Sequence, residues 1–139
     1  MKGKIIKIFG FILILTVLFS CITRKAVIKV TPEDEVYLNK VQNIPLEFIV
    51  KKDELVNVRA KARVFIETYG KNKVLIDTDC VIQSENEKYI VIFESVDSNS
   101  IKITVIYDEH VEIMTRNKLH IYIFAYYLQT GEINPKFLQ

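Results

Sequence analysis

The chain has 139 residues, of which 50% are hydrophobic and 26% charged, and its formal net charge is +2 at pH 7. Three of its 19 basic residues and none of its 17 acidic residues lie in the first 20 positions, so residues 21–139 carry a formal charge of −1. This length suffices for one domain. The near-neutral charge gives no basis for nucleic-acid binding, and we expect no nucleic-acid partner.

The first 21 residues have the layout of a secretory signal. The basic start contains Lys2, Lys4 and Lys7. The run 8–19 is strongly apolar except at Gly10 and Thr16, and it is shorter than the roughly 20 residues that span a bilayer comfortably. A basic start, a short apolar run and small residues at the end are typical of export signals. We therefore predict a signal peptide at residues 1–20.

The end of this signal, Leu18-Phe19-Ser20-Cys21, resembles the lipobox of bacterial lipoproteins. The resemblance implies that Cys21 becomes the lipid-modified first residue of the mature chain. Its thiol supplies the nucleophile that forms a thioether with diacylglycerol, and two or more acyl chains make anchoring stable. The alternatives are an ordinary signal peptide and an uncleaved anchor. The expected location is the cell membrane or outer membrane, lipid-anchored and facing the periplasm or exterior.

Residues 21–43 are expected to form a lipid-anchored tether and lead-in segment, and residues 44–139 a single domain. The pattern allows a short strand at 26–30 and a turn at 31–34, and leaves 35–41 open. The segment 44–50 is predicted as a strand, which Pro45 confines to a sheet edge or a strand start.

Residues 55–69 fit two periodicities, an alternating strand and an amphipathic helix. A helix over 54–69 is favoured because Asp53 can serve as its N-cap, with Glu54 in the first turn. Gly70 follows in the position of a C-terminal cap, and Arg63 can pair with Glu67 one turn later. A strand of this length would also be unusual.

Three strands are predicted over residues 73–83, 88–96 and 101–107, joined by short polar turns. Each has an apolar face that needs cover. Two of these faces comprise Tyr89, Val91 and Phe93, and Ile101, Ile103 and Val105. Cys80 shares a predicted strand face with Val74, Ile76 and Ile82, which indicates a buried, inert thiol; a reactive or dimer-forming thiol is the alternative.

A second helix is predicted over residues 111–129, although 119–128 is rich enough in strand formers for a strand to be the alternative. Gly131 lies where this helix should end. The expected fold class is therefore α+β. It has an antiparallel sheet of three to five strands, covered by two helices in the order β-α-β-β-β-α.

Two stretches, residues 78–84 (TDCVIQS) and 123–132 (IFAYYLQTGE), resemble patterns in small uncharacterised bacterial lipoprotein domains. Those domains are similar to the group of unknown function with a TBP-like fold. The resemblance covers about residues 44–139 and implies helices packed on an antiparallel sheet. It implies a shape and no activity, and "TBP-like" is not evidence of DNA binding.

No phosphate-cradling glycine loop and no HExxH, CxxC or GxSxG motif occurs in the sequence. We therefore predict no catalytic residue, no cofactor and no metal site. Asp77 and Asp79 would share a strand face about 7 Å apart, and Asp108 and His110 follow the last strand. Convergence of these four residues in one cleft would be the minimum sign of an envelope enzyme with an acidic site. His120 is expected to be a core or flanking histidine.

Four aromatic residues crowd the last predicted helix: Tyr122, Phe124, Tyr126 and Tyr127. Core packing explains most of them, and some could meet a protein partner or a second copy of the chain. The predicted function is a membrane-anchored exported lipoprotein that acts by binding or assembly, with membrane lipid engaged through Cys21. The alternative is a carrier of a small apolar ligand held between sheet and helices.

Overall fold

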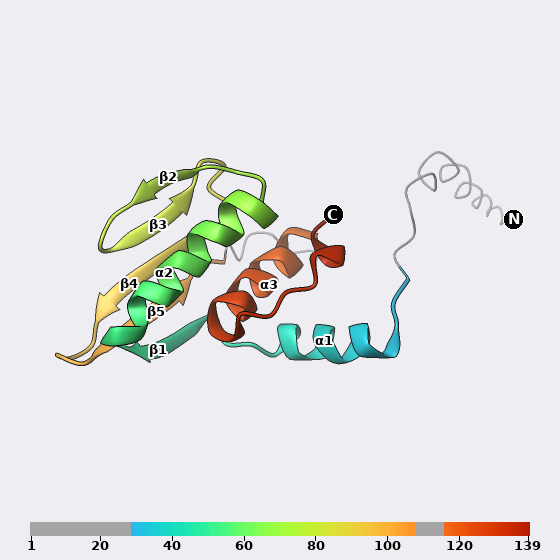
Figure 1. The fold of residues 1–139 in the computed structure, drawn as a ribbon, viewed down its shortest axis with the longest axis horizontal. Coiled ribbons are helices and arrows are strands. Elements are labelled where there is room, and N and C mark those ends of the chain that lie inside the picture. The colour runs from blue at the N-terminus through green and yellow to red at the C-terminus, as the bar shows by residue number, and fades with distance from the viewer. Residues whose placement is uncertain (1–28, 108–115) are drawn as a thin grey trace, which may run out of the picture. The chain divides into compact units, whose positions relative to one another are not determined.

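The computed structural model describes residues 29–107 and 116–139 (Figure 1). Cys21, Asp108 and His110, and with them the predicted signal peptide and lipid attachment, lie outside the described residues. Residues Thr31–Gln139 form one compact unit. This unit begins before the predicted domain start at residue 44.

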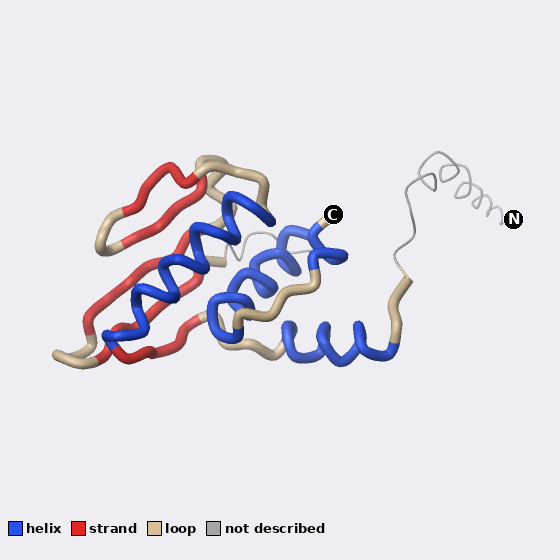
Figure 2. Tube along the Cα trace, in the orientation of Figure 1, coloured by secondary structure: helices blue, strands red, loops and turns tan. Residues whose placement is uncertain are grey.

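The unit has an α+β fold, as predicted (Figures 1 and 2). Its helices are α1 (Pro32–Gln42), α2 (Leu55–Val64) and α3 (Arg116–Thr130). Its strands are β1 (Glu47–Lys51), β2 (Val74–Asp77), β3 (Val81–Ser84), β4 (Ile90–Ser95) and β5 (Ser100–Val105). A 3-10 turn (Lys52–Glu54) leads into α2, a π-helical turn (Phe65–Tyr69) extends it, and another 3-10 turn (Pro135–Leu138) follows α3.

The five strands form one antiparallel sheet in the order β1-β5-β4-β3-β2. β1 lies at one edge, which agrees with the constraint predicted from Pro45. Helices α2 and α3 lie side by side against one face of the sheet, and α1 packs against α3 (Figure 1). In the described part of the unit, α2 and α3 thus cover one face of the sheet, and α1 is attached to this layer through α3.

The core lies between that face and the helices, and the predicted apolar faces of β4 and β5 are buried in it. Phe65 of the π-helical turn is at its centre, with ring centroids 4.8 Å from Phe124 and 5.2 Å from Tyr89. Burying an aromatic side chain of this kind contributes roughly 1.5–3 kcal/mol to folding. The interface between sheet and helices is therefore filled by interlocking side chains.

The predicted single strand over 73–83 is wrong, because a tight turn at residues 78–80 divides it into β2 and β3. The Thr78 hydroxyl accepts hydrogen bonds from the backbone N–H of Cys80 (3.2 Å) and of Val81 (3.1 Å). A threonine side chain that bonds to the backbone in this way competes with strand pairing. Cys80 consequently lies in the turn and is exposed, so the prediction of a buried thiol is also wrong.

The predicted turn at residues 31–34 is wrong, because Thr31 is the N-cap of α1. Its hydroxyl accepts from the N–H of Asp34, and the Asp34 carboxylate accepts from the N–H of Thr31 (3.0 Å), which forms a capping box. Pro32 fits the first helical turn because its missing N–H needs no partner there. Of the possible strand at 26–30, only residues 29 and 30 are described, and neither is in a strand.

Asp34, which caps α1, also attaches this helix to the segment that follows α3. Lys136 forms an ion pair with the Asp34 carboxylate, and the Asn134 amide donates to it (3.0 Å). The hydrogen bond from Lys136 is the largest cause that lowers the pKa of Asp34 to about 2. Asp34 therefore joins the first helix of the unit to its last turn.

The ends of the two predicted helices are partly as expected. The final helix is confirmed from Arg116 on, and the strand alternative for 119–128 is wrong. Gly131 follows it in the left-handed conformation (φ +78°), as predicted for a C-terminal cap. Asp53 is not the N-cap of α2, because it lies inside the 3-10 turn that precedes this helix.

Candidate binding pocket

The predicted acidic residues do not form a catalytic or metal site in the described part of the chain. Asp79 lies in the turn between β2 and β3, whereas Asp77 ends β2 and faces α2. Asp108 and His110 lie outside the described residues. Among the residues that are described, no group of three or more His, Cys, Asp or Glu side chains could hold a metal ion.

Asp77 is instead held by two arginines of α2. Its carboxylate lies 2.6 Å from a terminal guanidinium nitrogen of Arg59 and 2.6 Å from Nε of Arg63. The hydrogen bond from Arg63 is the main cause that lowers the pKa of Asp77 below its ordinary value. Arg63 of α2 thus pairs with Asp77 of the sheet. The ion pair that the sequence suggested between Arg63 and Glu67 is not among the ion pairs of the described residues. This cluster ties β2 to α2 and leaves no free base.

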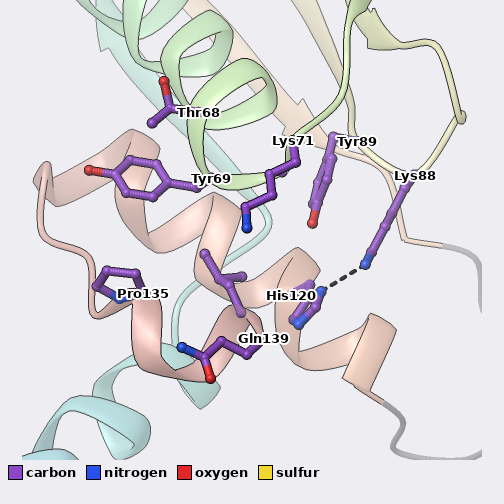
Figure 3. A pocket seen from close by; sticks show the side chains of 10 residues that line it. Thr68, Tyr69, Lys71, Lys88, Tyr89, His120, Pro135 and Gln139 are labelled. Atoms are coloured by element: carbon purple, nitrogen blue, oxygen red, sulfur yellow. Dashed lines mark hydrogen bonds between the residues drawn. The ribbon is translucent and has the colours of Figure 1, made fainter.

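The strongest candidate site is a surface pocket of about 400 Å³ at the end of the π-helical turn (Figure 3). Four segments meet there: the π-helical turn after α2 with the residues that follow it, the two residues before β4, the first half of α3 and the segment that follows α3. Its lining comprises Thr68, Tyr69, Gly70, Lys71, Lys88, Tyr89, His120, Pro135, Leu138 and Gln139.

The upper rim of this pocket is formed where α2 unwinds. The N–H of Gly70 donates to the carbonyl of Phe65 (2.7 Å), the wider spacing of a π-helical turn, and such turns occur frequently at functional sites. Gly70 itself has φ −79°, and the left-handed residue is the next one, Lys71 (φ 51°). Gly70 therefore follows the helix as predicted, but it is not a left-handed cap.

Close packing explains the glycine at this position. A Cβ at Gly70 would lie 2.9 Å from the carbonyl oxygen of Ile66 and 2.9 Å from Cε2 of Tyr89. The missing side chain lets the Tyr89 ring lie directly against the helix end. Tyr89 is only 2% exposed, and burial raises its pKa to about 12, so its hydroxyl stays protonated at neutral pH.

Lys88 and His120 meet on the opposite side of the pocket. Nζ of Lys88 lies 2.7 Å from Nδ1 of His120, which is buried on α3. A lysine ammonium has only protons to donate, so Nδ1 is the acceptor and the imidazole proton sits on Nε2. His120 is thus a histidine at the flank of the core, in keeping with the sequence-based expectation.

The pocket has the composition of an anion-binding site. The ammonium group of Lys71 and the hydroxyl of Tyr89 point toward the space that His120 borders (Figure 3). Among the described residues that line the pocket, none has a carboxylate side chain. Lysine ammonium groups and protonated hydroxyls donate hydrogen bonds that a carboxylate or phosphate accepts. Pro135 and Leu138 add apolar surface that the carbon skeleton of an organic anion could contact.

Sequence reasoning singled out only His120 among these polar groups. The pocket depends on a π-helical turn and on a left-handed lysine, and neither has a reliable pattern in sequence. The two lysines and the histidine are also far apart in the chain, at positions 71, 88 and 120. Gly70 was the one residue in the sequence that could have indicated the pocket. Its position after a helix suggested a cap, and its close contact with the Tyr89 ring was therefore not recognised.

The aromatic residues of α3 face other aromatic residues of the same unit. Tyr126 makes an edge contact with Tyr37 of α1 (5.6 Å between centroids), and Tyr127 lies 5.8 Å from Tyr69. Tyr122 lies 6.4 Å from Tyr107. Core packing therefore accounts for their positions, and a partner for them stays a prediction.

None of the helices within residues 29–107 and 116–139 combines the length and apolarity needed to cross a membrane. No protein-family model matches the chain, and comparisons with curated proteins and with solved structures find no match. The resemblance to lipoprotein domains with a TBP-like fold therefore stays a prediction.

Proposed function

We propose that this chain is an exported, lipid-anchored binding module that takes a small anionic ligand in the pocket at the end of α2. The observation that carries the binding role is the pocket itself. It combines the ammonium groups of Lys71 and Lys88 with the hydroxyl of Tyr89 and has no carboxylate side chain in its described lining. The ligand class that fits is a small organic carboxylate or phosphate.

The anchoring part of the proposal is supported by the sequence. A basic start, a short apolar run and Leu18-Phe19-Ser20-Cys21 occur in the order that lipid-modified export signals require. The compact unit begins at Thr31, ten residues after Cys21. Such an anchor would hold the module at a membrane surface and raise its effective concentration for neighbours there.

The other functions have less support. An apolar ligand between sheet and helices would need space that Phe65, Phe124 and their neighbours occupy. An acidic catalytic site would need a free carboxylate at Asp77, which two arginines hold. A binding module with a cationic surface pocket fits the described residues best.

Anchoring is tested by the intact mass of the chain purified from its native membrane fraction. We expect the mass of residues 21–139 plus a diacylglycerol group, with or without a further acyl chain. In the variant Cys21→Ser the lipid should be missing and the chain should leave the membrane fraction. An unmodified mass that begins near Cys21, or an intact mass that retains Met1, would contradict the anchor.

Ligand binding is tested by NMR titration of the ¹⁵N-labelled chain with inorganic phosphate. We expect saturable shifts at the amides of Lys71 and Tyr89, and about tenfold weaker binding in Lys71→Gln, because a charge-assisted hydrogen bond contributes roughly 1.5–3 kcal/mol. Lys40→Gln is the matched control, since Lys40 is exposed on α1, away from the pocket lining. Equal weakening by both variants would indicate unspecific charge attraction and contradict the proposal.

A further inference from the structure

The outer edge of β1 is open in the part of the chain that the structure describes, where β5 is its one partner strand. The N–H of Val105 donates to the carbonyl of Leu46 (2.7 Å), and the N–H of Lys52 donates to the carbonyl of Asn99 (2.8 Å). Backbone groups in an antiparallel pair face the partner strand at every second residue. The intervening residues, Glu47, Ile49 and Lys51, therefore direct their N–H and C=O groups toward the open edge.

The middle of this edge carries no charge, bulge or proline, although Pro45 precedes the strand and Lys51 ends it. Exposed edges are commonly blunted by central charges, bulges or proline. β1 is regular over its five residues, and its central side chain is Ile49, which is 60% exposed. The opposite edge differs, because β2 has a register break between Val74 and Ile76. An irregularity of this kind twists a strand and hinders pairing.

We propose that β1 is a self-association edge, at which a second copy of this chain pairs with β1 antiparallel about a two-fold axis at Ile49. The charges of the strand fit this register. Antiparallel pairing centred on Ile49 places Glu47 of each copy opposite Lys51 of the other, on the same sheet face as the two Ile49 side chains. If the axis moved by one residue, Ile49 of each copy would lie opposite Glu47 or Lys51 of the other copy. Both charge pairs would then be lost.

The backbone fits the same register. With the axis at Ile49, the residues that exchange hydrogen bonds across the copies are Glu47, Ile49 and Lys51, whose groups face the edge. On the other sheet face Phe48 would lie opposite Val50, and both are half-buried in the single copy, so pairing would extend the core. Glu47 also lies 4.0 Å from Lys102 of β5, a distance that leaves its carboxylate able to bond Lys51 of the second copy.

Cysteine cross-linking in the native membrane tests the axis. Residues directly opposite in a hydrogen-bonded antiparallel pair have Cα atoms about 5.5 Å apart, within disulfide range. In the full chain carrying Cys80→Ser, we expect Ile49→Cys to form a disulfide-linked dimer on mild oxidation. Leu75→Cys is the matched control, because Leu75 is 59% exposed on the opposite edge strand. The Cys80→Ser parent reports any cross-link through Cys21.

Charge reversal tests the register. Lys51→Glu in the Ile49→Cys chain should lower the dimer yield about tenfold, because two attractive cross-strand pairs become repulsive. The double variant Glu47→Lys with Lys51→Glu restores opposite charges across the axis and should restore the dimer. Equal dimer yields from Ile49→Cys and Leu75→Cys would overturn the proposal. Failure of the double variant to recover the dimer would overturn it as well.

Discussion

Replacing Gly70 by alanine separates two explanations for a glycine at a helix end. Gly70 has a helical φ of −79°, a conformation that alanine adopts easily. By backbone preference alone, Gly70→Ala should raise the free energy of unfolding by about 0.5–1 kcal/mol. The structure predicts the opposite sign, because the added methyl group has no room.

The size of the loss follows from the two atoms that the new Cβ would meet. Both the Ile66 carbonyl oxygen and Cε2 of Tyr89 lie at 2.9 Å. The first is helix backbone, and the second belongs to a buried ring packed against Phe65 and Phe124. Overpacking of this kind costs typically 1–3 kcal/mol. After the backbone gain of about 0.5–1 kcal/mol is subtracted, the net loss lies between about 0 and 2.5 kcal/mol, and we expect about 1 kcal/mol.

Urea unfolding followed by circular dichroism measures this loss, and Gly131 supplies the control. A Cβ at Gly131 meets nothing closer than 3.9 Å, but its φ of +78° disfavours alanine by about 1–2 kcal/mol. Asparagine tolerates this conformation, so Gly131→Asn should recover much of the stability that Gly131→Ala loses, whereas Gly70→Asn should recover none. Higher stability in Gly70→Ala than in the parent would refute the packing argument.

Two ion-pair clusters give further expectations. Asp77→Asn should lower the free energy of unfolding by only about 0.5–1.5 kcal/mol, because Asp77 is 34% exposed and solvent screens its bonds to Arg59 and Arg63; urea unfolding that shows no loss at low salt would contradict this. Asp34 has a lowered pKa, so its stabilisation is present above its ordinary value of 3.8 and is lost as the pH falls through about 2. Hydrogen exchange should therefore show α1 detaching between pH 4 and pH 2. An unchanged acid transition in Asp34→Asn would contradict protonation of Asp34, and loss of its ion pair with Lys136, as the cause.

The sequence determined the elements whose pattern is local and regular. Alternation in β4 and β5 located the buried face of the sheet, and Gly131 located the end of α3. These predictions succeed because strand period and left-handed glycine are properties of the chain over a few residues. The signal for α1 was also present, since Thr31-Pro32-Glu33-Asp34 is a capping box with proline in the first turn.

Tertiary structure decided the features that join distant residues. Thr78 bonds to the backbone of its own turn and divides a continuous apolar run into β2 and β3, which exposes Cys80 and brings Asp77 to the arginines of α2. The pocket gathers Lys71, Lys88 and His120 from three separate segments. The sequence by itself therefore determined the fold class and most of the layers, because periodicity records which face is buried. The partners of each polar side chain were decided only by packing, because those contacts depend on where the chain returns in space.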